Sequence, residues 1–275
     1  MILPTITKVE PISLKAIKIS WEFPVTLEDI GEYEFKLISS ESPDEDNPGN
    51  LLHTFNHEKE YVFDCSVKKV WKDIYFRIIA FNKGTGEKAC TDWVKMEDAP
   101  DLEALEIVRR NNILLTNRRH GIGLPIAVFK LKTVGPHCPD CWDFNKQKIR
   151  SSNCNSCYKT GIQGGYYAPI LTWANLTPPV KQLQIPQWGE MEANEIRIFM
   201  NNWPSVNPKD LVYIPSKQSF YTVEQVETSC RRGFVLHQLV ALSGCEKSSV
   251  VYKLLDEYPD KIKQLSEMRN RIKLK

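Results

Sequence analysis

Four cysteines carry the strongest chemical signal in this sequence. Cys138 and Cys141 are separated by two residues, and after twelve further residues Cys154 and Cys157 repeat that spacing. Two intervening residues let both thiolates of a pair reach one ion from a single tight turn, and two such turns supply four sulfur ligands. Zn²⁺ suits a tetrahedral set of thiolates, and a filled shell leaves no position for a reacting water. The spacing therefore predicts a structural zinc site.

Other states of these cysteines remain open from the sequence. Two disulfides or four reduced thiols fit the same spacing, and an iron–sulfur cluster also takes four cysteine ligands. His137 adjoins the first pair, and we expect it beside the ligands rather than among them. Zinc is favoured because both pairs are present and the first residues show no secretory signal.

The insert between the two pairs mixes aromatic and basic side chains, namely Trp142, Phe144, Lys146, Lys148 and Arg150. Such a loop can contact phosphates and bases. It can also stay solvated, with its aromatic residues packed on the zinc knuckle, the fold formed by the two Cys-x-x-Cys turns. The first reading leads to an alternative function for the chain, a zinc-ribbon nucleic-acid-binding protein.

The sequence offers no second chemical centre. It contains no P-loop, no GxGxxG after a strand, no GxSxG and no HExxH. Cys230 and Cys245 are spare thiols with no motif beside them, and Cys65 and Cys90 are expected to be buried free thiols. We therefore expect no enzymatic activity, no catalytic residues, no cofactor-binding residues and no small-molecule substrate. No stretch approaches the roughly 18 apolar residues of a membrane span, so no membrane partner is expected.

The fold class expected for the elements that position this centre is mainly β with short helices. Residues 1–98 read as a β-sandwich in which Tyr33, Phe35 and Leu37 alternate along one strand. They carry 12 basic and 18 acidic residues, whereas the remaining chain carries 24 and 16, which supports a boundary near residue 98. Residues 99–170 are expected to form a helix that begins near Asp101, followed by the four-cysteine region.

The remaining chain divides into a β-rich part and a tail. Residues 171–254 are expected to form a small β-barrel or sandwich. Within them, 210–214 and 220–226 read as a hairpin, and 173–179 reads as an extended connector. Residues 255–275 are predicted to be a basic helical tail whose narrow apolar stripe fits docking on a partner or an acidic surface.

The N-terminal region resembles a fibronectin type III domain over about residues 4–97. The resemblance rests on Trp21 in an early strand, the run FRIIAFN at 76–82 and the GTG turn at 84–86. It implies a spacer or adhesive module with no chemistry of its own.

The central region resembles a cysteine-rich virion structural protein of tailed bacteriophages, of the neck or head-to-tail connector type. The resemblance covers about residues 100–254, with its most specific part at CPDCWD (138–143) and CNSCYKTGIQGGYY (154–167). Lys159 departs from the pattern, in which glycine is usual. The matching residues are Cys138, Cys141, Trp142, Asp143, Cys154, Cys157, Thr160, Gly161, Gly164 and Gly165.

This resemblance implies a non-enzymatic ring subunit that joins portal and tail and is stabilised by structural zinc. The expected partners are further copies of the chain in a homo-oligomeric ring and the portal, tail or neck proteins, with contact to genomic DNA as a further expectation. The expected location is the neck of the virion, after synthesis in the host cytoplasm.

Overall fold

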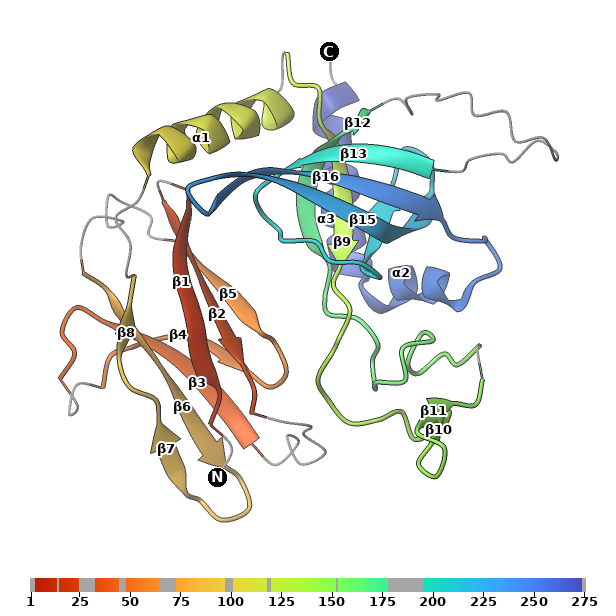
Figure 1. The fold of residues 1–275 in the computed structure, drawn as a ribbon. Coiled ribbons are helices and arrows are strands. Elements are labelled where there is room, and N and C mark those ends of the chain that lie inside the picture. Colours follow the sequence, from red (N-terminus) through yellow and green to blue (C-terminus); the bar gives the residue numbers. More distant parts are fainter. Residues whose placement is uncertain are drawn as a thin grey trace. The chain divides into compact units, whose positions relative to one another are not determined.

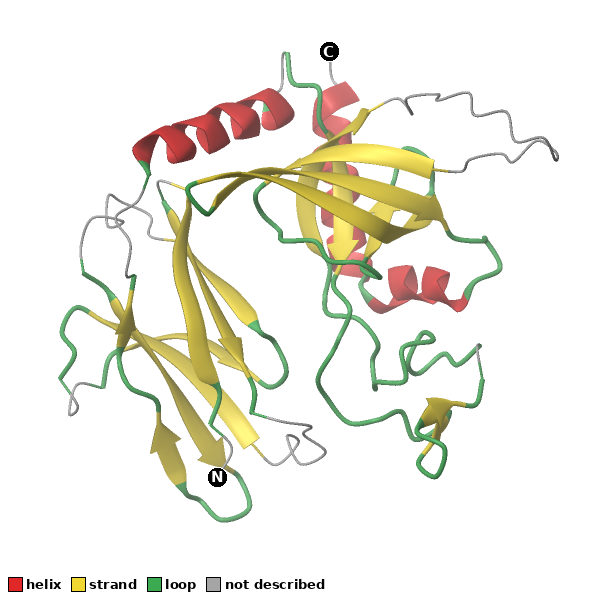
Figure 2. Cartoon of the chain, viewed as in Figure 1, coloured by secondary structure: helices red, strands yellow, loops and turns green. Residues whose placement is uncertain are grey.

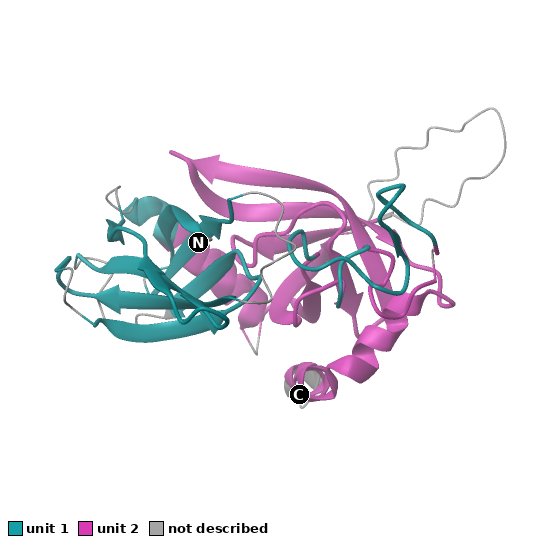
Figure 3. Ribbon diagram, turned by 90° about the horizontal axis from the view of Figure 1, so that it is seen from below, with its two compact units in different colours: residues 1–105, 132–150, 161–164 teal, residues 106–131, 151–160, 165–275 magenta. Residues whose placement is uncertain are grey.

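A computed structural model describes residues 3–13, 15–24, 33–44, 48–64, 73–96, 101–117, 120–151, 153–177 and 195–273. Of the described residues, 47% lie in strands and 15% in helices, which confirms the mainly β fold class. The chain forms two compact units (Figure 3). Unit 1 comprises residues 1–105, 132–150 and 161–164, and unit 2 comprises 106–131, 151–160 and 165–275. The boundaries expected at residues 98, 170 and 254 stay predictions.

Two antiparallel sheets in unit 1 share one hydrophobic core (Figure 1). The first sheet has the order β1 (Thr5–Ser13), β2 (Ala16–Glu22), β5 (Glu60–Asp64). The second has the order β4 (Asn50–Phe55), β3 (Tyr33–Ser40), β6 (Tyr75–Asn82), β7 (Lys88–Cys90), and β8 (Val94–Lys95) also pairs with β6. The alternation in β3 has its expected effect, because Tyr33, Phe35 and Leu37 all enter the core. Trp21 from β2 is buried beside them, and its indole N–H donates a hydrogen bond to the carbonyl oxygen of Glu58 at 2.7 Å.

Six strands of unit 2 close into a barrel (Figure 2). Their order is β12 (Ile170–Thr177), β13 (Glu195–Asn201), β16 (Phe234–Gly244), β15 (Ser219–Arg231), β14 (Leu211–Ile214), β9 (Leu124–Phe129). The predicted hairpin is confirmed as the antiparallel pair β14–β15. The segment expected to be a connector is strand β12 as far as Thr177, and residues 178–179 lie outside the described residues.

Strand β9 lies before the cysteine region in sequence, yet it closes the barrel by pairing with β12 and β14. Its side chains are buried on both faces, which explains its uninterrupted apolar run. Ile126 and Val128 belong to a core to which all six strands contribute, and therefore face the barrel interior. Ala127 and Phe129 belong to a second core on the outer face. The cysteine region is therefore part of a long insertion, residues 130–169, between two neighbouring barrel strands, and this insertion is called the excursion below.

Short helices complete the architecture: α1 (Leu102–Thr116), the 3-10 helix η3 (Val250–Lys253), α2 (Leu254–Glu257) and α3 (Pro259–Lys273). The predicted start of α1 is confirmed, because the Asp101 carboxylate accepts hydrogen bonds from the N–H groups of Glu103 and Ala104 at 3.0 and 3.1 Å. In α3, Leu265 is buried and Ile262 packs beside it in the second core of unit 2. The first two residues of the apolar stripe, Ile262 and Leu265, therefore pack within the chain. No helix in the described part of the chain is long and apolar enough to cross a membrane.

A buried glutamine fastens the loop between β13 and β14. The Gln238 side chain is 2% exposed. It accepts a hydrogen bond from the N–H of Val206 at 3.0 Å and donates to the carbonyl oxygens of Asn201 and Pro204 at 3.0 and 2.8 Å. These bonds satisfy backbone groups that water cannot reach.

We expect Gln238→Leu to lower the free energy of unfolding by about 1–3 kcal/mol. The leucine side chain would leave the buried backbone N–H and carbonyl groups of the loop without hydrogen-bond partners. Urea denaturation of the full chain measures this loss. Gln225→Leu is the matched control, since Gln225 is exposed on the neighbouring strand β15, and its effect should stay within about 0.5 kcal/mol. Equal losses in the two variants would contradict the role assigned to Gln238.

Candidate metal centre

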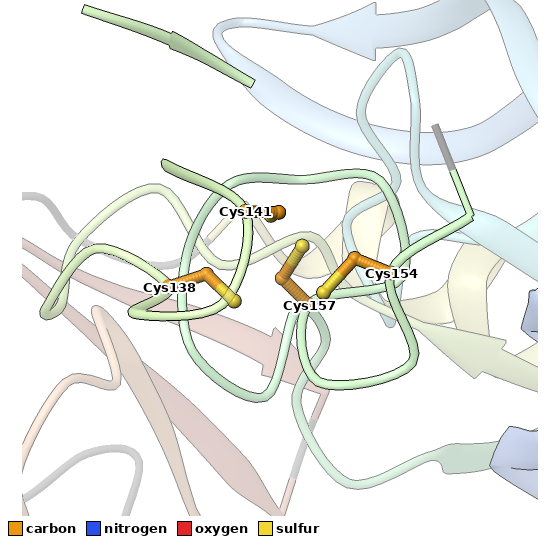
Figure 4. Close-up of side chains that lie close together, drawn as sticks. All are labelled: Cys138, Cys141, Cys154 and Cys157. Atoms are coloured by element: carbon orange, nitrogen blue, oxygen red, sulfur yellow. The ribbon is translucent and has the colours of Figure 1, made fainter. Parts of the chain in front are cut away.

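The structure brings the four predicted cysteines together. The Sγ atoms of Cys138, Cys141, Cys154 and Cys157 all lie within 4.8 Å of one another, and each residue is buried. Figure 4 shows the side chains converging from two separate stretches of chain. A tetrahedral site with Zn–S distances of about 2.3 Å has S–S edges of about 3.8 Å, so the donor set fits one such ion. The cluster can therefore bind a metal ion, and the identity of that ion is not fixed by the geometry.

Both Cys-x-x-Cys segments fold in the same way. In the first, the N–H of Trp142 donates to the carbonyl oxygen of Cys138 at 3.0 Å. In the second, the N–H of Tyr158 donates to the carbonyl oxygen of Cys154 at 3.1 Å. Each bond joins residues i and i+4 and closes a five-residue turn, which places the two thiols of a pair on the same side of the backbone. This is the geometry that the two-residue spacing predicts.

The chain after the second pair turns through left-handed backbone conformations. Lys159 has φ 71° and Gly161 has φ 79°, in the region that glycine occupies without a Cβ penalty. Lys159 therefore adopts a backbone conformation that non-glycine residues rarely take. Thr160 stabilises the turn, because its N–H and its hydroxyl both donate to the carbonyl oxygen of Cys157, at 2.9 and 2.7 Å.

Gly165 is required by close backbone contact. Its φ is 53°, and a Cβ at this position would lie 2.5 Å from the carbonyl oxygen of Cys157. Gly165→Ala should lower the free energy of unfolding by about 2–3 kcal/mol, since backbone atoms next to a thiol ligand must shift.

Urea denaturation and resistance of the bound metal to a chelator measure the effect of Gly165→Ala. Gly233→Ala is the matched control, because Gly233 also has a positive φ of 79° but has nothing within 4 Å of the added Cβ. That variant should cost only about 1–2 kcal/mol of conformational strain and leave the metal in place. Faster metal loss from Gly233→Ala than from Gly165→Ala would contradict this account.

The root of the excursion is tied to the barrel. The N–H of Tyr167 donates to the carbonyl oxygen of Lys130 at 2.9 Å, and Leu131 forms a β-bridge with Tyr166. The carboxylate of Asp210, which is 2% exposed, accepts the N–H of Leu131 at 2.8 Å and that of Asn207 at 2.8 Å. Asp210 thus fixes the point where the chain leaves β9. Sequence reasoning missed this role, because nothing in the run NPKD indicates a partner 79 residues away.

The second cysteine turn, which belongs to unit 2, also packs on the core of that unit. Tyr158, directly after Cys157, belongs to the second core of that unit, and its hydroxyl donates a hydrogen bond to the Glu257 carboxylate of α2 at 3.0 Å. Burial, and then the Glu257 carboxylate, raise the pKa of Tyr158 to about 12. The phenol therefore stays protonated and able to donate this bond at neutral pH.

His137 precedes Cys138 in sequence, and among the described residues the compact cluster of possible ligands consists of the four cysteines. Its ring stacks on Trp142 with the ring centroids 4.0 Å apart. Trp142 belongs to β10 (Trp142–Asp143), which pairs with β11 (Lys148–Ile149) in a small hairpin. The Arg150 guanidinium beside Asp143 lowers the pKa of that carboxyl group.

The other described cysteines lie apart from this cluster. Cys90 is exposed on β7, so its expected burial is wrong, because β7 is a short strand at the edge of its sheet. Cys65 lies outside the described residues. Cys230 is exposed, and burial raises the pKa of Cys245, which disfavours the nucleophilic thiolate.

No protein-family model matches the chain, and no curated protein matches it.

Proposed function

We propose that this chain is a non-enzymatic structural protein of a tailed-bacteriophage virion, a subunit of the neck or head-to-tail connector ring. The observation that carries the proposal is the match between the resembling motif and the residues on which the knuckle depends. The motif cysteines are the clustered thiols, and Gly161 and Gly165 occupy positive-φ positions with close neighbours. Asp143, also in the motif, braces the β10–β11 hairpin. Because these motif residues have structural roles in the four-cysteine region, they support the proposal that the matched segment has the fold of the proteins it resembles.

The proposed ion is structural zinc. Four buried thiols fill a tetrahedral shell, so the ion would stabilise the knuckle without presenting an open position to a substrate. An iron–sulfur cluster takes the same ligands. Elemental analysis of the purified protein separates the two, because zinc predicts one metal per chain without the visible absorption of an iron–sulfur cluster.

The N-terminal part is proposed to be a fibronectin type III-like module attached to this connector. Two antiparallel sheets around one core support the assignment, because fibronectin type III domains share the sandwich architecture. The module would act as a spacer or adhesive element. All buried members of its core lie between Ile6 and Ala80, so residues 1–98 are predicted to melt cooperatively when produced alone.

Immunoelectron microscopy tests the proposed location. Antiserum raised against the full chain should label tailed particles at the junction of head and tail, and pre-immune serum should not. Labelling confined to the capsid surface or the tail tip, or particles that lack the chain, would overturn the proposal. Native mass spectrometry of the metal-loaded chain adds the copy number, with a closed ring of identical subunits as the expected state.

A further inference from the structure

We infer that the tip of the β10–β11 hairpin binds single-stranded nucleic acid, with Phe144 stacking on an unpaired base and Lys146 and Lys148 contacting the flanking phosphates. The inference does not rest on the proposed virion function, because it uses only the chemistry of this hairpin. It develops one of the two readings of the basic and aromatic insert that the sequence left open.

The aromatic ring at the tip is unusually accessible. Phe144 is 64% exposed, the highest value among the large hydrophobic side chains with substantial exposure in the described part of the chain. Single exposed apolar residues are common on protein surfaces, so exposure by itself does not make a site. The surroundings of Phe144 distinguish it from the others.

The backbone around Phe144 is held in place from the base of the hairpin. The Asp143 carboxylate accepts hydrogen bonds from the N–H groups of Asn145 and Lys146, at 3.0 and 3.3 Å. The same carboxylate forms an ion pair with Arg150 at 3.3 Å. Asp143 is itself buried, so the turn that carries Phe144 is fixed by a side chain that solvent hardly reaches. A preorganised aromatic residue loses little conformational entropy when it stacks on a ligand.

Neighbouring rings provide further support. His137 stacks on Trp142 with the rings 5° from parallel, and the Phe144 ring meets His137 nearly at right angles, with the centroids 6.3 Å apart. The stack supports the root of the Phe144 side chain and leaves most of its ring in water. This arrangement offers an aromatic face to an incoming flat group.

The charge at the tip selects a polyanion. Lys146, Lys148 and Arg150 lie within seven residues that contain no acidic side chain, residues 144–150. Arg150 is engaged by Asp143, whereas Lys146 and Lys148 are exposed on the tip and on β11. A flexible strand with unpaired bases offers a flat face for Phe144 and phosphates for both lysines, which is the usual mode of single-strand recognition. In a duplex the base faces are stacked inside, so it matches only the lysines.

Fluorescence anisotropy with a labelled twelve-residue oligothymidylate tests the inference on the full, metal-loaded chain. Phe144→Ala should weaken binding by about five-fold to a hundred-fold, the range of base–aromatic stacking, and Phe144→Trp should restore it. Lys146→Glu combined with Lys148→Glu should weaken binding and reduce the slope of log affinity against log salt by about 1.4. Leu51→Ala and Lys83→Glu are matched controls on exposed residues of unit 1, and they should bind like the unaltered chain.

Three outcomes would overturn the inference. The first is no binding of the oligonucleotide at low salt, and the second is unchanged affinity in Phe144→Ala. The third is equal affinity for polyglutamate, which would indicate a surface for acidic proteins. A duplex of matching length should bind more weakly and should not respond to Phe144→Ala. Metal content of each variant verifies that the knuckle is intact.

Discussion

Cys157→Ser is expected to abolish metal binding by the full chain. Cys157 is fully buried within the cluster, and a serine hydroxyl is a poor replacement for a thiolate ligand. Structural Zn²⁺ contributes about 10–16 kcal/mol of apparent binding free energy in small zinc domains, and this energy is available only when the folded site binds the ion. Elemental analysis should fall from one metal per chain to nearly none, and the knuckle should become sensitive to proteases.

Cys90→Ser and Cys230→Ser provide the controls for that experiment. Both residues are exposed and free, so their replacement should change neither the metal content nor the protease resistance of the knuckle. Full metal content in Cys157→Ser would contradict the assignment of the ligands. Acidification gives a second readout, because protons compete with the metal for thiolates and should release it as the pH falls.

The parts of this site that the sequence could predict are local. Cys-x-x-Cys spacing fixes which thiols can share a turn, and the structure closes both turns with the same backbone hydrogen bond. The β14–β15 hairpin was predictable for the same reason, since two apolar runs are separated by a short polar turn. The start of α1 at Asp101 is likewise set by a side chain and its immediate neighbours.

The parts that could not be predicted depend on contacts between distant segments. Strand β9 pairs with β12 across more than forty residues, and no feature of its sequence specifies that partner. Its uninterrupted apolar run fits a strand buried on both faces, but identifies neither the barrel nor the covering elements. Asp210 shows the same limitation, because its buried carboxylate serves a backbone N–H group on Leu131. Such roles follow from the closed barrel rather than from local spacing.

These long-range contacts give the metal centre a fixed origin. The chain leaves the barrel after β9 and returns to it at β12, and hydrogen bonds join the two crossing points at Lys130 and Tyr167. Phe129 packs β9 against its neighbours on the outer face of the barrel, whereas Phe144 lies exposed on the β10–β11 hairpin. Removing the Phe129 ring should therefore lower the free energy of unfolding far more than removing the Phe144 ring.

Phe129→Ala tests that expectation directly. Phe129 lies at the end of β9, is fully buried, and packs against Phe220 and Tyr258 with ring centroids 5.5 and 6.3 Å away. Truncating the side chain leaves a cavity between the barrel and the helices on its outer face, so the free energy of unfolding should fall by about 3–5 kcal/mol. Urea denaturation monitored by circular dichroism measures the loss.

Phe144→Ala is the matched comparison, because the same ring is removed fifteen residues along the chain from a position that is 64% exposed. Its unfolding free energy should stay within about 0.5 kcal/mol of that of the unaltered chain, since little packing is lost at the tip. Phe129→Leu keeps most of the buried volume and should recover more than half of the loss seen with alanine. If Phe129→Ala were as mild as Phe144→Ala, the outer face of β9 would not be packed as described, and the root of the metal centre would need another support.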